Sequence, residues 1–409
     1  MSSLLHLSVA HVLLLLQLLS LSTAFLNKPY KINKLLYDDE SIVLFDSEEK
    51  VQAISADPRF NDFMFLIWVI RDYGRPDNIF MTTFERLLEF TRGSNCIHAV
   101  IEISNNDYSS ILESVVRKIP DNSVFTLNGN AMQYDICNLA HMRKMHGFKP
   151  PVVFHLNQGI GSYSPPVVSG MHPNGTHCYN SEFREVYSQY TYVFRSFYYA
   201  EWYGLSHYVP IGPAFARHTR YHVQSEGILS ADERDYWCLF SGRTKYIYET
   251  RHQVQRLDMI EAMEQQQYSL EGNSNRTCRT STGEQNEFTH TMDHEEYIRT
   301  MGRTVFAPCP AGNNPETFRH YEAMALGAVP LIVRVPFPEE DFMQAWIGYP
   351  GPVFESWKEA LLFVSSVSIS EVKEIQRDVI SWYYMYMAAH RENITNTLLS
   401  LVGRVVVTD

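Results

Sequence analysis

Many familiar enzyme signatures are absent from this chain of 409 residues. No G-x-S-x-G, H-E-x-x-H, G-x-x-x-x-G-K or G-x-G-x-x-G segment occurs, which argues against the usual hydrolases, metalloproteases and NTPases. Lys and Arg are scattered, and 34 of them against 46 Asp and Glu give a formal net charge of −12. A nucleic-acid partner is therefore not expected, and an anionic ligand must be held by a local site.

Long apolar runs are also scarce, and only the N-terminus carries one. Residues 1–27 contain no Asp, Glu, Lys or Arg, and residues 12–19 are mostly Leu. Ser22 and Ala24 are small residues of the kind that precedes a signal-peptidase site. We therefore predict a signal peptide over residues 1–24, cleaved after Ala24, with an uncleaved N-terminal membrane anchor as the alternative. Either outcome delivers the rest of the chain to the secretory pathway, and we expect it in the Golgi lumen.

No C-x-x-C pair occurs among the six cysteines, which excludes a zinc ribbon and a thioredoxin motif. The cysteines stand at positions 96, 137, 178, 238, 278 and 309. A secretory location favours disulfides between some of them, but their spacing does not choose the pairs. The same location makes Asn174, Asn275 and Asn393, each in an N-x-T sequon, candidate acceptors of N-glycans.

Short apolar runs alternate with helix-like stretches along the first half of the chain, as in domains built on a parallel sheet. Strands are predicted over residues 63–70, 98–103, 123–127, 152–156, 191–194 and 207–211. Helical patterns occur at residues 83–90 and 110–118. The polar stretch 216–235 contains few large apolar residues, so we predict a linker there.

The alternation begins again after this stretch. Strands are predicted over residues 236–240, 304–307 and 329–333, and helices over residues 248–266, 293–301 and 315–326. Residues 271–287 are polar and lack periodicity, which indicates an exposed insertion. The sequence thus predicts two α/β domains, at residues 25–225 and 226–390, and a C-terminal tail at residues 391–409.

A Pro- and Gly-rich loop at residues 308–314, followed by a helix, is the clearest candidate for a binding site. Asn314 is a suitable N-cap, Pro315 suits the first helical position, and Gly327 can end the helix. The loop then leads to a helix N-terminus at the C-terminal edge of a parallel sheet. Free N–H groups and the helix dipole attract a diphosphate at such a place.

Three charged residues of the predicted helix are expected to face this ligand. Glu316, Arg319 and Glu322 follow one another in three-residue steps and form a slanted stripe. Arg319 can contact a phosphate by charge, and Glu322 can accept hydrogen bonds from two ribose hydroxyls. The alternative is an exposed ladder of ion pairs, which contributes only about a few tenths of a kcal/mol.

This segment resembles the exostosin-type glycosyltransferases, which include heparan-sulfate polymerases, plant cell-wall transferases and the ribitol β-1,4-xylosyltransferase of dystroglycan. The residues that match the family pattern are Phe306, Cys309, Pro310, Gly312, Arg319, Glu322, Ala323, Gly327 and Pro330. A weaker match covers residues 240–243, which look like the family's donor loop, and residues 353–357 and 382–384. The pattern is closest to the ribitol xylosyltransferase branch. Ala307, where Leu is common, and Arg303, where a small residue is common, depart from it.

The resemblance implies an α/β fold of the GT-B type, with two Rossmann-like domains facing a central cleft. The first domain would take the acceptor and the second a nucleoside-diphosphate sugar. The donor-binding residues that it implies are Gly242, Arg243, Lys245, Gly312, Asn314, Glu316, Arg319 and Glu322. Family members invert the anomeric centre and usually need no metal, so we expect no cofactor. Arg243, Lys245 and Arg319 would instead meet the charge of the leaving diphosphate.

An inverting transfer needs a base that deprotonates the acceptor hydroxyl. His155, on a predicted strand of the first domain, is the first candidate, and Glu201 and His207 are alternatives. The other interpretation of His155 is a core histidine with satisfied hydrogen bonds. Arg195 follows an apolar strand and is a candidate for orienting acceptor or phosphate.

Two clusters of metal-ligand residue types occur, and neither predicts a metal site. His290 and His294 lie four residues apart, but no third ligand is apparent nearby. The acidic run at residues 38–40 precedes the strands of the first domain, so a solvated acidic face is the simpler interpretation.

The predicted function is therefore that of an inverting glycosyltransferase acting on a glycan or glycoprotein. A non-catalytic glycan-binding or chaperone-like protein with the same fold is the alternative, but such a protein should lack the pair Arg319 and Glu322. A retaining GT-B enzyme should carry two Glu separated by seven residues on the helix, whereas five residues separate Glu316 from Glu322.

Overall fold

The structure is a computed structural model. It describes residues 42–45, 64–72, 96–104, 123–128, 139–141, 143–156, 183–200, 204–214, 216–242, 253–269, 276–280, 292–312 and 314–401. The predicted signal sequence, the acidic run at 38–40 and the helical patterns at 83–90 and 110–118 lie outside these residues. Within them, no helix combines the length and the apolar character needed to cross a membrane.

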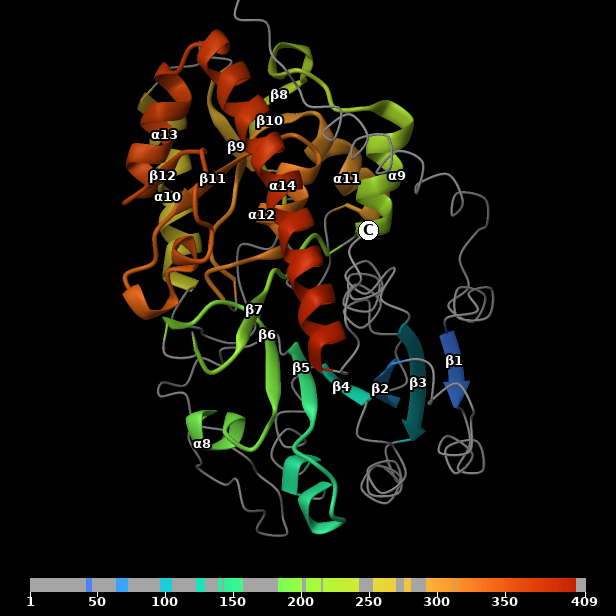
Figure 1. Cartoon of the computed structure of the whole chain (residues 1–409). Coiled ribbons are helices and arrows are strands. Elements are labelled where there is room, and N and C mark those ends of the chain that lie inside the picture. The colour runs from blue at the N-terminus through green and yellow to red at the C-terminus, as the bar shows by residue number, and fades with distance from the viewer. Residues whose placement is uncertain are drawn as a thin grey trace, which may run out of the picture. The chain divides into compact units, whose positions relative to one another are not determined.

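The first sheet has seven strands and is built from the N-terminal half of the chain (Figure 1). Its strands are β1 (Ile42–Phe45), β2 (Met64–Asp72), β3 (Cys96–Ser104), β4 (Ser123–Asn128), β5 (Val152–Leu156), β6 (Tyr192–Ser196) and β7 (His207–Val209). Their order is β1-β3-β2-β4-β5-β6-β7, and the strands from β3 to β7 pair in parallel. The six predicted strands are confirmed, whereas β1 was not predicted.

The second sheet has five parallel strands. They are β8 (Tyr236–Phe240), β9 (Cys278–Thr280), β10 (Thr304–Pro308), β11 (Val329–Val333) and β12 (Val353–Phe354). The strand order is β12-β11-β10-β8-β9, so β9, which follows β8 in the chain, pairs on one side of β8, and β10 pairs on the other side. The strands β8 and β10 therefore flank a topological switch point, which is where open α/β sheets bind ligands.

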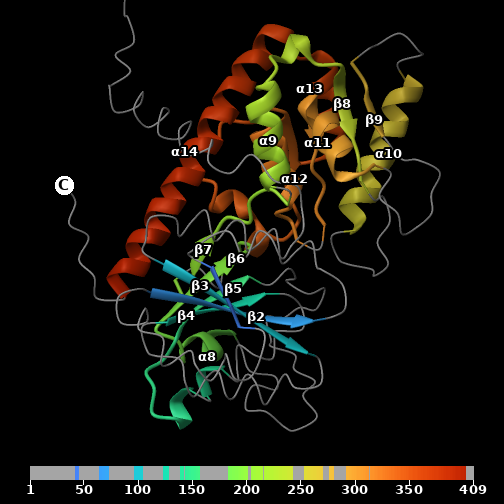
Figure 2. The ribbon, with the colours of Figure 1, turned by 90° about the vertical axis from the view of Figure 1, so that its right-hand side faces the viewer.

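The helices that cover the sheets follow the expected alternation. The described part of the chain includes α8 (Phe183–Tyr187), α9 (Ala216–Glu226), α10 (Gln253–Ser269), α11 (His294–Gly302), α12 (Phe318–Ala325), α13 (Trp357–Ser366) and α14 (Ile369–Leu401). Short 3-10 turns lie at η5 (Ala231–Glu233), η6 (Pro338–Glu340) and η7 (Phe342–Gln344). Helices α9, α11 and α12 pack together, as Figure 2 shows, and α10 packs against α13.

Both faces of the second sheet are buried. Phe306 and Leu331 belong to a core cluster with residues of α10 and α13. Ala307 belongs to a different cluster, with residues of α11 and with Ala323 of α12. Strands covered on both faces need apolar side chains at successive positions, which explains the unbroken apolar runs. The small side chain of Ala307, one of the departures from the family pattern, leaves room for α12.

The predicted linker is wrong for residues 216–226, which form α9. Few of its side chains are large and apolar, so the sequence shows no apolar stripe. The helix nevertheless packs against α11 and α12, with Ala216 and Thr219 buried. Gly227, at φ 75°, follows the helix, and its N–H donates to the Val223 carbonyl at 3.0 Å. A helix that packs with the second sheet's helices thus begins where a linker was expected.

The predicted exposed insertion at 271–287 is wrong for residues 278–280, which form β9. Cys278 is buried and forms a disulfide with Cys238, its direct partner in the parallel register of β8 and β9. The bond ties this edge strand to the sheet and stabilises the fold chiefly by restricting the unfolded chain. Cys309 is free and buried.

Helix α14 continues to Leu401, into the stretch predicted as a C-terminal tail. Its first half packs against α12 and η5. Near its end, Thr397 shares a hydrogen bond with Tyr192 of β6. Helix α14 therefore contacts strands of both sheets, β11 and β6.

Candidate active site

Arg319 of α12 contacts the end of β8 and the loop that follows it, at the switch point. Its Nη2 donates to the Ser241 carbonyl at 2.6 Å, and its guanidinium carbon lies 4.6 Å from the centroid of the Phe240 ring. A Cβ on Gly242 would lie 2.3 Å from the same Nη2, so the observed guanidinium position requires glycine there. Arg319 as a whole residue is half-buried. The structure thus brings two predicted site residues, Gly242 and Arg319, into contact and fixes a cation between β8 and α12.

A half-buried tyrosine and a buried carboxylate support this cation. Tyr297 of α11 shares a hydrogen bond with Arg319, and its hydroxyl donates to Glu322 Oε2 at 2.7 Å. Glu322 Oε1 accepts from the Ala214 N–H at 3.1 Å. Burial lowers the pKa of Arg319, but Tyr297, Cys309 and Glu322 outweigh burial and raise this pKa above its ordinary value. Arg319 is therefore a permanent cation, and a ribose bound to Glu322 would share the carboxylate with two protein donors.

Helix α12 begins at Phe318, so the predicted start at Pro315 is wrong. Thr317 is the N-cap residue, and its N–H donates to His320 Nδ1 at 3.1 Å. Burial lowers the pKa of His320 to about 3, which keeps the ring neutral and able to accept. The predicted cap, Asn314, is buried in the preceding loop. The sequence did not show the true start because histidine here takes the place of the Glu or Gln of an ordinary capping box.

The predicted end of α12 is confirmed. Gly327 has a φ of 75°, its N–H donates to the Met324 carbonyl at 3.1 Å, and the Ala328 N–H donates to the Ala323 carbonyl at 2.8 Å. This is the Schellman arrangement that glycine permits. Arg234 also donates to the last turn of the helix, through the Leu326 carbonyl at 2.9 Å. The helix that carries Arg319 and Glu322 is thus firmly anchored at its C-terminus.

Glu316 precedes α12, so the predicted helical stripe of three charged residues is wrong. Its Oε1 accepts from the Tyr208 hydroxyl of β7 at 2.5 Å and from the Tyr321 hydroxyl. Glu316 is 2% exposed, and burial raises its pKa to about 7 although both hydroxyls favour the ionised form. The alternative of an exposed ion-pair ladder is wrong as well, because Glu322 is only 3% exposed.

The loop after β10 is held by a glutamine that the sequence did not reveal. Gln255 Oε1 accepts from the Ala311 N–H at 2.7 Å, and its Nε2 donates to the Val333 carbonyl at 2.7 Å. The Gly312 N–H donates to the Asn314 carbonyl at 2.9 Å, which closes the loop on itself. The predicted donor residues Gly312 and Asn314 therefore lie in a fixed loop beside the switch point. The other two, Arg243 and Lys245, lie outside the described residues.

His155, predicted as the base, is buried in the first sheet with 1% exposure. Its Nδ1 accepts from Arg195 Nη1 at 2.7 Å and lies 2.9 Å from the Tyr187 hydroxyl. Burial, followed by the charge of Arg195, holds the pKa of His155 well below 6.5. The neutral ring therefore carries its proton on Nε2, and Nδ1 has no lone pair to offer an acceptor sugar. This geometry favours the interpretation of His155 as a core histidine, and a role as base stays a prediction.

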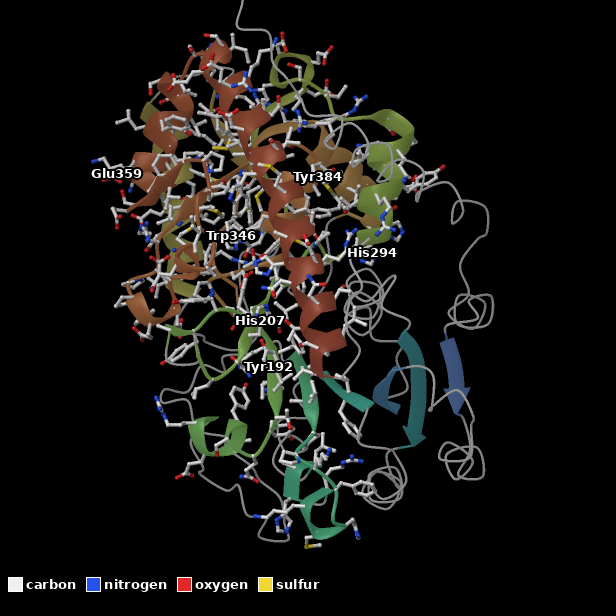
Figure 3. The ribbon with its side chains drawn as sticks, viewed as in Figure 1. Tyr192, His207, His294, Trp346, Glu359 and Tyr384 are labelled. Carbon is white, nitrogen blue, oxygen red and sulfur yellow. A yellow bond between two sulfur atoms is a disulfide. The ribbon has the colours of Figure 1, made fainter. Side chains whose placement is uncertain are left out.

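The other candidate residues are the alternative bases His207 and Glu201 and the histidine pair His290 and His294. His207, labelled in Figure 3, lies with its ring centroid 6.2 Å from that of Tyr192, and burial lowers its pKa. Glu201 and His290 lie outside the described residues. The remaining histidine of the helical pair, His294, begins α11. Across the described part of the chain, no group of three or more His, Cys, Asp and Glu is arranged to hold a metal ion.

The two parallel sheets and the helices around them have the GT-B fold. Trehalose-6-phosphate synthase OtsA shares the fold with a TM-score of 0.52 at 10% identity, over 84% of this chain and 99% of that chain. A UDP-forming trehalose-phosphate synthase from Burkholderia xenovorans has a TM-score of 0.50 at 10% identity, over 84% of this chain and 99% of that chain. At such low identity these enzymes show the fold alone. The predicted GT-B fold is confirmed.

The family comparison is more specific. Residues 218–402 match the family model described as the RXYLT1 C-terminal domain, that of a ribitol xylosyltransferase. This range contains the whole second sheet and the site around Arg319. Comparison with curated protein sequences finds no match. The predicted resemblance is thus confirmed for the second half of the chain, and the protein is a glycosyltransferase.

Several residues of this site were missed by sequence reasoning. They are Tyr208, Gln255, Tyr297 and Tyr321. Tyr208, Gln255 and Tyr297 lie on β7, α10 and α11, and Tyr321 lies on α12 beside residues of the core. Only the fold brings their hydroxyl or amide groups to the charged residues, so no local pattern could have identified them.

Proposed function

We propose that the protein is an inverting glycosyltransferase that moves a sugar from a nucleoside diphosphate to a hydroxyl of a glycan or glycoprotein. The observation that carries the proposal is Arg319, a permanent cation fixed at the switch point and partly open to solvent. Negative charge grows on the diphosphate as the glycosidic bond breaks. A guanidinium held in place beforehand stabilises that charge without reorganising during the reaction.

The family match guides the choice of donor and acceptor. Its name, ribitol xylosyltransferase, supports a xylosyl group as the sugar to be transferred and a ribitol hydroxyl as the acceptor. The neighbouring structures include enzymes described as UDP-forming, which supports a UDP-linked donor. We therefore propose UDP-xylose and a ribitol-terminated glycan as the first pair of substrates to test.

The stereochemical course is part of the proposal. One structural neighbour, a trehalose-6-phosphate synthase with a TM-score of 0.51 at 10% identity over 82% of this chain and 99% of that chain, is described as transferring with retention. The present chain lacks the spacing of two glutamates expected of a retaining enzyme, and Glu316 does not even lie on α12. Inversion also fits the family resemblance, in which the acceptor hydroxyl attacks the anomeric carbon opposite the leaving diphosphate.

Metal independence and a secretory location complete the proposal. Arg319, together with Arg243 and Lys245, which follow β8 in the sequence, would neutralise the diphosphate in place of a cation. The disulfide between Cys238 and Cys278 supports an oxidising compartment such as the lumen of the secretory pathway. Exposed Asn393, on α14, would be available there as an N-glycan acceptor.

The proposal is tested by incubating the purified protein with UDP-xylose, UDP-glucose, UDP-galactose and UDP-N-acetylglucosamine, each with and without a ribitol-terminated oligosaccharide. We expect UDP release to depend on both UDP-xylose and the acceptor, and NMR of the product to show an inverted anomeric centre. Retention would contradict the stereochemical proposal. Inertness with every donor, with no donor raising the melting temperature, would instead support the non-catalytic alternative.

A further inference from the structure

The two carboxylates on either side of Arg319 in the sequence bind the same stretch of chain. This stretch, residues 210–214, leads from β7 to α9 and is called the connecting segment below. Glu322 accepts from the Ala214 N–H at its end. Glu316 accepts from the Tyr208 hydroxyl just before it, and the backbone of Ile211 also favours the ionised form of Glu316. Two buried carboxylates thus hold the chain that follows β7, the last strand of the first sheet, against α12, the helix that carries Arg319.

The connecting segment is well suited to transmit this restraint. Pro210 and Pro213 have fixed φ angles, and Gly212 adopts a φ of 65° that few other residues tolerate. Residues 208–213 are all buried. Ile211 also packs in one core cluster with Tyr321 of α12. A stiff, buried segment moves as a unit, so its attachment to Glu316 and Glu322 fixes the position of β7 relative to α12.

We propose that Tyr208 and Glu316 are positioning residues, which lock the connecting segment onto the start of α12 and thereby hold Arg319 in its productive place. Neither residue touches the substrate in this proposal, because Glu316 and Tyr208 are both buried, at 2% and 9% exposure. The inference rests on the proposed function, since its first readout is the rate of sugar transfer.

The charge of Glu316 gives the proposal a distinctive signature. As a carboxylate, Glu316 accepts strongly from both tyrosine hydroxyls, whereas its protonated form accepts more weakly. The titratable groups that surround this network are Tyr208 on β7, Tyr321 on α12, and Tyr386 and His390 on α14. Burial raises the pKa of Tyr208 and Tyr321 well above 10 and lowers that of His390 to about 4, so these three stay neutral near pH 7.

The test compares Glu316→Gln, Tyr208→Phe and the double variant with wild type, using UDP-xylose and the acceptor that supports transfer. Glutamine imitates the protonated acid, and phenylalanine removes only a hydroxyl. We expect each single variant to lower kcat by about tenfold at pH 8 and the double variant to be no worse than either, while KM for UDP-xylose changes by less than about threefold. Tyr384→Phe is the matched control. It removes a hydroxyl that donates to the Ala325 carbonyl of α12 at 3.4 Å, away from the connecting segment, and should leave kcat unchanged.

The pH profile separates positioning from a merely structural role. The ratio of wild-type kcat to that of Glu316→Gln should rise from about one below pH 6 to about ten at pH 8, because only wild type gains the carboxylate. If wild type is active and the kcat of both single variants stays within twofold of the wild-type kcat at all pH values, this inference is overturned and the proposed function stands. Wild type that is inert with every donor would overturn the proposed function, and this inference with it.

Discussion

Each half of this protein contains an arginine hydrogen-bonded to a tyrosine, Arg195 on β6 and Arg319 on α12, and the two arginines differ in their surroundings. In the first sheet, Arg195 donates to Tyr187 and to His155, and all three are buried. At the second sheet, Arg319 is linked to Tyr297 and lies at the switch point with part of its surface exposed. The same chemical groups therefore form a buried core network in one half of the chain and, in the other, the half-buried cation that we propose binds the donor.

The largest expected effect is the loss of Arg319. Arg319→Lys keeps the charge but loses the planar fork, so kcat should fall roughly 10²-fold while donor affinity changes much less. Arg319→Ala should lose both. Steady-state kinetics with a melting curve on each variant measures this. Arg303→Ala is the control, because Arg303 forms an exposed ion pair with Asp235 at 2.7 Å and should leave kcat near wild type. A kcat within about twofold of wild type for Arg319→Ala would remove its catalytic role.

The second prediction concerns the stability of the protein at different pH values. The folded state raises the pKa of Glu316 from 4.5 to about 7, so it binds a proton that the unfolded chain releases between these values. Stability therefore falls as the pH rises from about 4.5 to 7. Glu316→Gln cannot titrate, and its free energy of unfolding relative to wild type should increase by up to about 3 kcal/mol between pH 4.5 and 8. Urea denaturation at several pH values measures the free energy of unfolding of both proteins. If the two free energies change in parallel with pH, Glu316 is not the titrating group.

Glu322→Gln tests the ribose contact. An amide accepts through one oxygen only and lacks charge, so donor affinity should fall by ~1.5–3 kcal/mol, about tenfold to a hundredfold. Calorimetry with UDP measures this loss. Unchanged UDP binding would mean that the carboxylate serves only Ala214 and Tyr297.

His155→Phe probes the closed network of the first sheet. Phenylalanine removes the Nδ1 acceptor that lies beside Arg195 Nη1 and the Tyr187 hydroxyl in the core, which should destabilise the fold by about 2 kcal/mol. The kcat of the folded variant should stay within about threefold of wild type. A fall of roughly 10²-fold or more at unchanged substrate KM would instead restore His155 as the general base.

The smallest expected effect is that of EDTA. Because arginine and the helix terminus meet the diphosphate charge in our proposal, transfer should be nearly unchanged in its presence. Loss of activity that Mn²⁺ restores would contradict metal independence.

The sequence predicted much of the fold because strands in a covered parallel sheet are locally marked by apolar runs. The strands β5, β8 and β11 agree with their predicted bounds to the residue. Helix α9 and strand β9 escaped prediction, since one is stabilised by packing on α11 and α12 and the other by a disulfide to Cys238. Neither kind of stabilisation leaves a pattern within the segment itself.

The candidate site was predictable only in part for a similar reason. Gly242 stands out in the sequence because its loop approaches Arg319 too closely for a side chain, as a Cβ there would lie 2.3 Å from Arg319 Nη2. The true partners of Glu316 did not stand out, because Tyr208 lies 108 residues away in sequence. A helical projection placed Glu316 on the ligand face, but the N-cap is Thr317, three residues after the predicted cap Asn314, so Glu316 lies outside the helix.

The central claim is that Arg319 binds the diphosphate of the donor without help from a metal. Titration calorimetry of UDP into wild type and Arg319→Ala, both in EDTA, tests it most directly. The account predicts binding to wild type and at least about tenfold weaker binding to the variant, a loss of about 1.4 kcal/mol or more. Equal dissociation constants for the two proteins, with both folded by their melting curves, would contradict it.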